Sequence, residues 1–247
     1  MMESAAGAEN PHAVEVWPVW LNAAPSSVET FRALLSGQEL IRAQRFKFPA
    51  LSAAFIQTRA ALRILAARRL NADPRKLVIS TGTHGKPHIE AFPGFGFNLS
   101  HSGNLAVFAF VSGAHVGVDV EELRGLNDCD ILVNRYFSEL EKREYRSLAP
   151  DLQQQAFFNA WTRKEAFVKA TGEGLSLPLS AFSVSLTPGA PVSIVVPAER
   201  ATDDDWQLEN LAIHTGYAAA LAYSGHRRAS AAHPLLDMDS LAANPWL

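Results

Sequence analysis

Two carboxylates stand two residues apart in the segment Gly117–Glu121, which reads Gly-Val-Asp-Val-Glu. The alternation of valine with polar residues predicts a strand, in which Asp119 and Glu121 lie on the same face. Carboxylates about 7 Å apart along a strand offer the hard oxygen ligands that Mg²⁺ prefers. A strand whose polar face is exposed to solvent would show the same alternation. This segment alone therefore does not distinguish a Mg²⁺ site from an exposed strand face.

A second set of reactive side chains follows a helical spacing. In the segment WTRKEAFVKA, the residues Trp161, Glu165 and Lys169 recur every four positions and share one helix face. A carboxylate beside a lysine and an apolar wall is a suitable setting for proton transfer in a phosphoryl reaction. An ordinary surface Glu–Lys pair is the alternative. The glycines at 172 and 174 are suited to end this helix.

Two shorter motifs could bind an anion. The segment FNLSHSG places Ser100 and His101 where a strand passes into a turn, and both can donate hydrogen bonds. A capped turn with a structural histidine is the alternative. The turn Gly-Lys-Pro presents Lys86. Because neither a Gly-x-Ser-x-Gly elbow nor a Walker loop surrounds these residues, a hydrolase triad and a P-loop are not indicated.

The elements that must position these residues mix strand and helix patterns without the strict alternation of a doubly wound sheet. Strands are expected at residues 14–21, 76–80, 106–111, 116–121, 182–186, 192–196, 206–213 and 218–223. Helices are expected at residues 28–46, 51–70, 131–148 and 152–171. This mixture predicts an α+β fold.

A faint internal repeat suggests two similar halves. Residues 101–113, HSGNLAVFAFVSG, resemble residues 214–225, HTGYAAALAYSG, because each reads as a turn and an apolar strand that closes on Ser-Gly. We therefore expect an N-terminal half over residues 1–113, a C-terminal half over 114–225 and an irregular tail over 226–247, with a site between the halves. Chance convergence on strand composition is the alternative.

The composition excludes several classes of protein. A chain of 247 residues that is 48% hydrophobic can bury a sizeable core. A net charge of -3 argues against a strongly basic nucleic-acid binder, and the single cysteine, Cys129, excludes a disulfide framework. No apolar run reaches the roughly 18 residues of a membrane span, and the first residues lack the features of a secretory signal. A soluble, cytoplasmic protein with no nucleic-acid or membrane partner is expected.

Basic residues are concentrated between positions 42 and 76, where nine Lys or Arg residues accompany a single acid. Arginine guanidinium groups suit phosphate oxygens, which favours an anion site. The apolar positions around Leu62 and Leu65 fit an amphipathic helix with a solvated basic face equally well. Composition alone does not choose between the two.

The order and spacing of four motifs are more specific than any one of them. The segments Gly85–Pro87, Phe97–Ser102, Gly117–Glu121 and Trp161–Leu179 together resemble the 4′-phosphopantetheinyl transferases of the surfactin-synthetase-activating type. The resemblance extends from about residue 42 to residue 223. It implies a pseudo-dimeric fold with two similar α/β halves in one chain and the active site between them, which agrees with the internal repeat.

The resemblance implies a Mg²⁺-dependent enzyme. It would transfer the 4′-phosphopantetheine group of coenzyme A to a serine of an apo acyl or peptidyl carrier protein and release adenosine 3′,5′-bisphosphate. By motif, Asp119, Glu121 and Glu165 would hold Mg²⁺ on the pyrophosphate, where a hard cation offsets phosphate charge. Glu165 would also accept the serine proton, directly or through water, and Lys169 would stabilise or protonate the leaving bisphosphate.

Contacts with coenzyme A follow from the same resemblance. The side chains expected to make them are Arg45, Arg59, Lys86, Ser100, His101, Lys164 and Lys169. The arginines match the basic residues that the family places near the 3′-phosphate, although Glu39 stands about where some members have lysine. Arg63 is expected to lie on the helix surface.

Carrier docking is expected on a strip between the strand with the carboxylates and the catalytic helix. This strip contains Arg135, Tyr136, Phe137 and Leu148, and its assignment rests on family analogy. Because two halves in one chain would complete the site, a monomer is expected.

Three other functions compete with this one. A Mg²⁺-dependent phosphohydrolase would use the same carboxylates to cleave the pyrophosphate of coenzyme A with water, and a carrier requirement separates it from a transferase. An inactive protein that binds coenzyme A or a carrier would not need every metal and base position to be acidic. A purely structural protein leaves the four spaced motifs unexplained.

Overall fold

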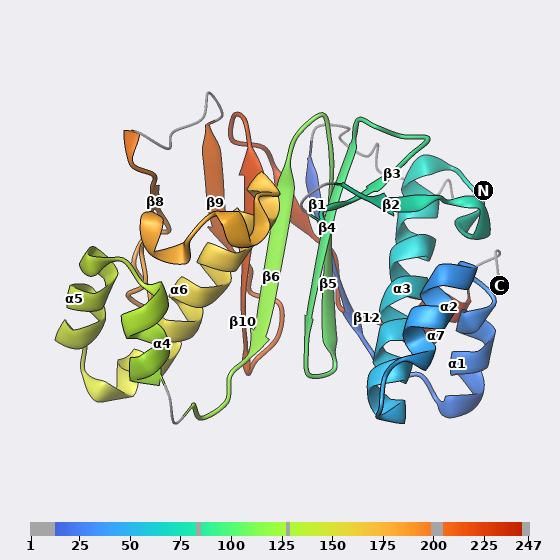
Figure 1. Cartoon of the computed structure of the whole chain (residues 1–247), viewed down its shortest axis with the longest axis horizontal. Coiled ribbons are helices and arrows are strands. Elements are labelled where there is room, and N and C mark those ends of the chain that lie inside the picture. The colour runs from blue at the N-terminus through green and yellow to red at the C-terminus, as the bar shows by residue number, and fades with distance from the viewer. Residues whose placement is uncertain (1–12, 83–84, 127–128, 199–204, 244–247) are drawn as a thin grey trace, which may run out of the picture.

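Two sheets stand between two long helices in the computed structural model, which describes residues 13–82, 85–126, 129–198 and 205–243 (Figure 1). The long helices are α3 (Pro49–Leu70) and α6 (Pro150–Thr171). Each has 22 residues and begins at a proline, a residue suited to the first helical turn. The predicted α+β fold class is confirmed.

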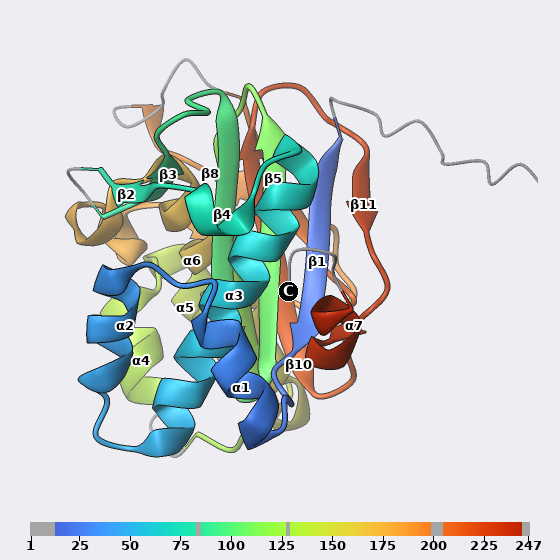
Figure 2. The same ribbon diagram turned by 90° about the vertical axis from the view of Figure 1, so that its right-hand side faces the viewer.

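The first sheet is formed mainly from the N-terminal part of the chain. Its strand order is β11-β1-β5-β4, and β5 pairs antiparallel with both β1 and β4. Helix α3 packs on this sheet beside α1 and α2 (Figure 2). Besides α3, the elements of this part are β1 (Val14–Trp20), α1 (Pro25–Arg32), α2 (Gly37–Gln44), the 3-10 turn η1 (Pro74–Lys76), β2 (Ile79–Thr81), β3 (Pro87–Ile89), β4 (Phe95–Ser102) and β5 (Leu105–Ser112).

The second sheet has the order β6-β10-β9, and its pairings are antiparallel. Helix α6 packs across it, and α4 and α5 lie against α6. Besides α6, the elements of this part are β6 (Val116–Glu122), α4 (Cys129–Tyr136), α5 (Glu139–Ser147), η2 (Gly174–Ser176), η3 (Leu179–Ala181), β7 (Ser183–Val184), β8 (Ile194–Val195), β9 (Trp206–Asn210) and β10 (Tyr217–Ser224).

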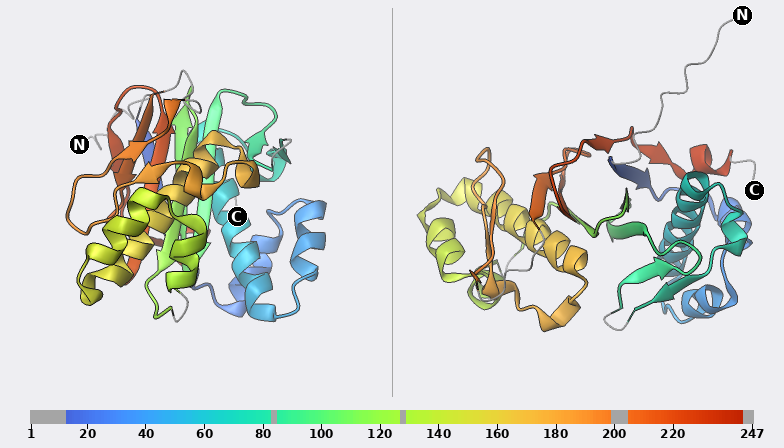
Figure 3. Two further views of the ribbon diagram at one scale, coloured as in Figure 1. Left: turned by 60° about the vertical axis from the view of Figure 1, so that its left-hand side comes forward. Right: turned by 90° about the horizontal axis from the view of Figure 1, so that it is seen from above.

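An apolar core joins the two sheets. The view from above shows the strands of both sheets in the space between α3 and α6 (Figure 3). Buried aliphatic side chains from both sheets meet there, among them Val16 and Val107 from the first and Val118 and Leu221 from the second. Because burial of such side chains is the main stabilising term in folding, the two sheets form one packed unit.

The sequence predicts a single helix before each long helix, but the structure has two short helices in each place. Residues 28–46 form α1 and α2, and residues 131–148 form α4 and α5. In each case the second short helix begins at a serine capping box, made by Ser36 with Glu39 and by Ser138 with Glu141. A serine whose side chain accepts a hydrogen bond from the backbone N–H three residues later is favoured at the start of a helix and disfavoured in its interior.

The prediction of an irregular tail is wrong for residues 230–242. Strands β11 (Ser230–Ala232) and β12 (Leu236–Asp237) pair parallel with β1, and helix α7 (Met238–Ala242) follows. Met238 and Leu241 are fully buried in the core beneath α3. The tail therefore completes the first sheet and its core.

Helix α3 reaches the length and apolar composition of a membrane span, contrary to the expectation from the sequence. An 18-residue window has a mean hydropathy of 1.2, and 61% of that window is buried inside the protein. Packing against the first sheet accounts for this apolar composition.

Candidate active site

Strand β6 lies at the edge of the second sheet and carries the two predicted carboxylates. Val118 and Val120 point into this apolar core, so Asp119 and Glu121 point to the opposite face. That face is covered by α6, whose backbone lies close to β6 at Gly117. A Cβ atom at position 117 would lie 2.1 Å from the carbonyl oxygen of Ala166 and 2.4 Å from the backbone nitrogen of Ala170. Glycine therefore allows the helix to lie directly on the strand.

Helix α6 contributes Trp161, Glu165 and Lys169, which line one hollow as the four-residue spacing predicts. The ammonium nitrogen of Lys169 lies 2.6 Å from Oδ1 of Asp119 and also donates to the hydroxyl of Ser100 at 3.0 Å. The hollow has a volume of about 390 Å³. The structure thus brings the strand and helix motifs together.

Strand β4, at the edge of the first sheet, supplies hydroxyl groups to the carboxylates. Ser100 donates to Oδ1 of Asp119 and Ser102 donates to Oε2 of Glu121, both at 2.8 Å. Asn98 accepts a hydrogen bond from the backbone of β6 at 2.9 Å. Positions 98, 100 and 102 alternate along β4, so one polar face of this strand meets β6. Ser102 was not among the predicted site residues, although its alternation with Ser100 is a signal that could have identified it.

The carboxylates of the hollow resist ionisation. Burial raises the pKa of Asp119, Glu121 and Glu165, and the charge of Asp119 raises the pKa values of the two glutamates further. Lys169 opposes all three shifts through its positive charge. His101 keeps an exposed edge at the rim of the hollow, where the surrounding protein and the charge of Lys169 lower its pKa.

The same carboxylates are the residues that could hold a divalent cation. Oδ2 of Asp119 is buried without a hydrogen-bond partner, which is costly for a carboxylate oxygen unless a cation or donor joins it. The mutual repulsion of the three carboxylates also favours an added positive charge. Within the described part of the chain, however, no three His, Cys, Asp or Glu side chains are already gathered closely enough to form a metal site.

A larger apolar pocket adjoins the hollow and has a volume of about 700 Å³. Leu99, Trp161, Glu165 and Lys169 border both spaces. The remaining lining residues of the pocket are Gly85, Lys86, Pro87, Asn98, Arg135, Tyr136, Val168, Gly172, Gly174, Leu177, Pro178, Leu179 and Ser180. A mostly apolar pocket beside a charged hollow suits a ligand with a polar end and a long, less polar arm.

Two of the predicted basic contacts lie apart from the hollow. Lys86 borders the apolar pocket, and its ammonium group donates to the carbonyl of Ala170 at 2.6 Å. Burial lowers the pKa of Lys86 to about 8. Arg45 is exposed at the C-terminal end of α2 and lines neither space.

Arg59 and Arg63 form a buried cluster with Glu39. Nε of Arg59 lies 2.5 Å from one carboxylate oxygen of Glu39, and a guanidinium nitrogen of Arg63 lies 2.8 Å from the other. The expectation that Arg63 lies on the helix surface is wrong, since only 2% of its side chain is exposed. Arg59 is engaged by this glutamate, so the structure does not support its expected phosphate contact.

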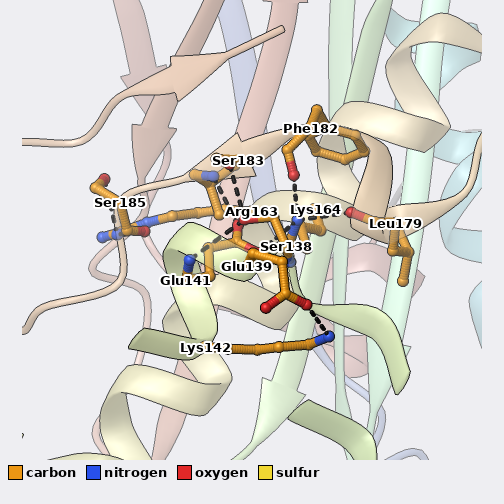
Figure 4. Close-up of polar contacts among 11 residues, drawn as sticks. Ser138, Glu139, Glu141, Lys142, Arg163, Lys164, Leu179, Phe182, Ser183 and Ser185 are labelled. Carbon is orange, nitrogen blue, oxygen red and sulfur yellow. Dashed lines mark hydrogen bonds and ion pairs between the residues drawn. The ribbon is translucent and has the colours of Figure 1, made fainter. Parts of the chain in front are cut away.

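Lys164 is fully buried and does not line the hollow. Its ammonium group contacts Glu141 at 2.8 Å and two backbone carbonyl groups (Figure 4). The expected contact of Lys164 with coenzyme A is therefore corrected to a structural contact. Phe137, expected on the docking strip, is also fully buried, whereas Arg135 is exposed.

Clustered carboxylates with raised pKa values, a neighbouring lysine and an adjoining apolar pocket suit an enzyme that acts on a phosphorylated substrate. Residues 115–222, which include both β6 and α6, match the family model of the 4′-phosphopantetheinyl transferase superfamily.

Several known proteins are similar to this chain. The 4′-phosphopantetheinyl transferase HetI of Nostoc sp. (strain PCC 7120) is 35% identical over 215 residues, which cover 86% of this chain and 88% of the relative. The 4′-phosphopantetheinyl transferase Sfp of Bacillus subtilis (strain 168) is 32% identical over 169 residues, which cover 68% and 74%. A crystal structure of a holo-(acyl-carrier-protein) synthase from Bacillus anthracis is 19% identical, with a TM-score of 0.38 over 44% of this chain and 94% of that one. The chain belongs to the 4′-phosphopantetheinyl transferase superfamily.

Proposed function

We propose that this enzyme transfers the 4′-phosphopantetheine group from coenzyme A to a serine of an apo acyl or peptidyl carrier protein, with Mg²⁺, and releases adenosine 3′,5′-bisphosphate. The observation that carries the proposal is the hollow in which Asp119 and Glu121 of β6 meet Glu165 and Lys169 of α6. Family membership supports the same reaction.

Asp119, Glu121 and Glu165 would hold the Mg²⁺ ion, since Asp119 has a buried oxygen without a partner and the three groups repel one another. When bound, Mg²⁺ would neutralise charge on the pyrophosphate of coenzyme A. Lys169 and His101, which border the same hollow, would contact the phosphate oxygens. Ser100 is 8% exposed and bonded to Asp119, so its role would be to orient this carboxylate.

Glu165 would act as the general base. It would accept the proton of the carrier serine, whose oxygen would then form a bond to the phosphorus atom that carries pantetheine. The bond from this phosphorus to the bridging oxygen breaks, and adenosine 3′,5′-bisphosphate leaves with that oxygen. Lys169 would stabilise the leaving group through its charge. A carboxylate whose pKa is raised by burial is suited to this proton transfer.

The apolar pocket would receive the pantetheine arm of coenzyme A. It adjoins the hollow and shares Glu165 and Lys169 with it, so a ligand could place its pyrophosphate in one space and its arm in the other. Lys86, which borders this pocket, would attract the phosphates. Arg45 is exposed and borders neither space, and it would contact the 3′-phosphate outside them.

We also propose that the chain consists of two similar halves, residues 1–113 and 114–225, with the site between them. The element order of a strand, two short helices, a 22-residue helix and two strand pairs occurs twice. Both main sheets share one order as well, since β1-β5-β4 corresponds to β6-β10-β9. The repeated HSG and HTG segments contribute the central strands β5 and β10. A single chain would then complete the site as a monomer.

Intact-mass spectrometry of an apo carrier protein tests the reaction directly. The carrier is incubated with the enzyme, coenzyme A and Mg²⁺, and a parallel sample contains EDTA. We expect a mass gain of one phosphopantetheinyl group that EDTA abolishes, together with equimolar adenosine 3′,5′-bisphosphate. Release of the bisphosphate without a carrier would instead indicate a phosphohydrolase, and coenzyme A binding without any release would indicate an inactive binding protein.

The pH dependence of kcat/KM should be bell-shaped. The carboxylates must lose their protons to act, and their raised pKa values place the rising limb above the ordinary glutamate value of 4.5. Activity should fall again as Lys86 loses its charge near pH 8. A Lys86→Arg variant keeps its charge at alkaline pH and should retain activity above pH 8. An unchanged alkaline limb in this variant would contradict the role of Lys86.

A further inference from the structure

Two buried cations occupy corresponding positions on the two long helices. Arg63 and Lys164 each lie 14 residues after the proline that begins α3 or α6. Each pairs with the glutamate of a serine capping box, Glu39 in α2 or Glu141 in α5. Each also donates to two backbone carbonyl groups of the segment that follows its own helix. We call these arrangements the Arg63 clamp and the Lys164 clamp.

The Lys164 clamp is fully buried and closely bonded (Figure 4). The ammonium group of Lys164 lies 2.8 Å from Glu141 and donates to the carbonyl groups of Leu179 and Phe182, both at 2.7 Å. The carboxylate of Glu141 in turn accepts hydrogen bonds from the backbone N–H groups of Ser138 and Val184, both at 2.7 Å. The clamp therefore ties α6 and the start of α5 to the chain around η3.

The segment held by the Lys164 clamp forms one wall of the apolar pocket. Residues Leu177–Ser180, which we call the pocket wall, line this pocket together with Trp161 and Glu165 of α6. Leu179 belongs both to the clamp, through its carbonyl oxygen, and to the lining. Lys164 itself is fully buried and does not line the pocket.

The Arg63 clamp holds a segment that does not line the site. Arg63 donates to the carbonyl groups of Pro74 and Leu77 at 2.8 and 3.0 Å. Residues 74–77 line neither the carboxylate hollow nor the apolar pocket. The chain thus contains two clamps of the same construction, and one of them has no contact with the site.

We propose that Lys164 is a positioning residue, whose clamp holds the pocket wall in the geometry that binds the arm of coenzyme A. This inference rests on the proposed function of the pocket. Loss of the clamp should free the wall but leave Glu165 and Lys169 in place, because α6 is held against β6 by its close contact at Gly117. Binding of coenzyme A should therefore weaken while the chemical step is preserved.

A matched pair of variants tests this inference, Lys164→Met and Arg63→Met. Both remove a buried charge and its two carbonyl contacts, and both should lower the melting temperature. We expect Lys164→Met to raise the KM for coenzyme A roughly tenfold and to change kcat by less than about threefold, the pattern of lost ground-state binding. Arg63→Met should leave this KM within about twofold of the native value.

Hydrogen exchange provides a readout that does not depend on activity. Amide exchange should accelerate over residues 174–184 in Lys164→Met and over residues 72–78 in Arg63→Met. If exchange in the first segment stays unchanged, the Lys164 clamp does not hold the wall and the inference fails. If the native enzyme modifies no carrier, the proposed function fails, while exchange still reports on the clamp.

The double variant Lys164→Met/Glu141→Gln separates positioning from stability. It removes the buried carboxylate that Lys164→Met alone leaves uncompensated, so it should regain part of the lost melting temperature. The carbonyl groups of Leu179 and Phe182 still lack their donor, so the KM for coenzyme A should stay raised. A KM that returns to the native value together with stability would overturn the positioning role. This double variant also carries the test if Lys164→Met does not fold.

Discussion

Substitution of Gly117 by alanine is expected to lower the transfer rate by about 100-fold. The added Cβ would lie 2.1 Å from the carbonyl oxygen of Ala166, in the backbone of α6, so the helix has to move away from β6. Such a shift separates Glu165 and Lys169 from the carboxylates of β6, and a misplacement of about 1 Å costs a factor of this size. Intact-mass kinetics on a carrier protein measure the effect.

Gly125→Ala is the matched control. Gly125 lies just beyond the end of β6, and no atom lies within 4 Å of a Cβ placed there. This variant should keep the native rate and melting temperature. Gly117→Ala should also lose about 1–3 kcal/mol of unfolding free energy, the usual cost of overpacking. A Gly117→Ala enzyme with the native rate would show that the contact between α6 and β6 does not align the two sets of residues.

Replacement of Glu165 by glutamine is expected to reduce kcat by roughly 10²–10⁴-fold, because an amide of the same shape cannot accept the serine proton. The same variant should be more resistant to heat. Burial and the charge of Asp119 raise the pKa of Glu165, so its ionised form destabilises the folded state at neutral pH and the neutral amide removes that cost. Single-turnover kinetics and thermal unfolding at pH 7 check the two expectations.

Glu173→Gln serves as the control for loss of a negative charge. Glu173 is exposed beyond the C-terminal end of α6 and lines neither the hollow nor the apolar pocket. Its rate, metal dependence and melting temperature should match those of the native enzyme. A Glu165→Gln enzyme that retains the native kcat would remove Glu165 from the role of general base.

Local patterns predicted the residues that meet in the hollow. Alternation along β6 and four-residue spacing along α6 each orient side chains before any tertiary contact forms, so Asp119, Glu121, Glu165 and Lys169 could be assigned to two faces. Residue spacing does not show how the two faces meet. The close approach at Gly117 that brings them together depends on packing between elements.

The errors have a common physical cause. Arg59 and Lys164 were expected to contact coenzyme A because of the family resemblance, yet each pairs with a glutamate distant in sequence, Glu39 or Glu141. Such long-range pairing is not encoded in local periodicity. The interrupted helices did carry a local signal, because Ser36 and Ser138 are each followed three residues later by glutamate.

The position of β11 and β12 against β1 has a consequence for biosynthesis. Strand β1 is synthesised long before β11 and β12, which pair with one of its edges in the part of the chain that the structure describes. Until the ribosome has synthesised Met238 and Leu241, the core beneath α3 also lacks two buried side chains. The N-terminal part of the nascent chain therefore emerges with an open strand edge and an unfilled core, a state prone to aggregation. The first sheet and its core can be completed only after residues 230–242 have been translated.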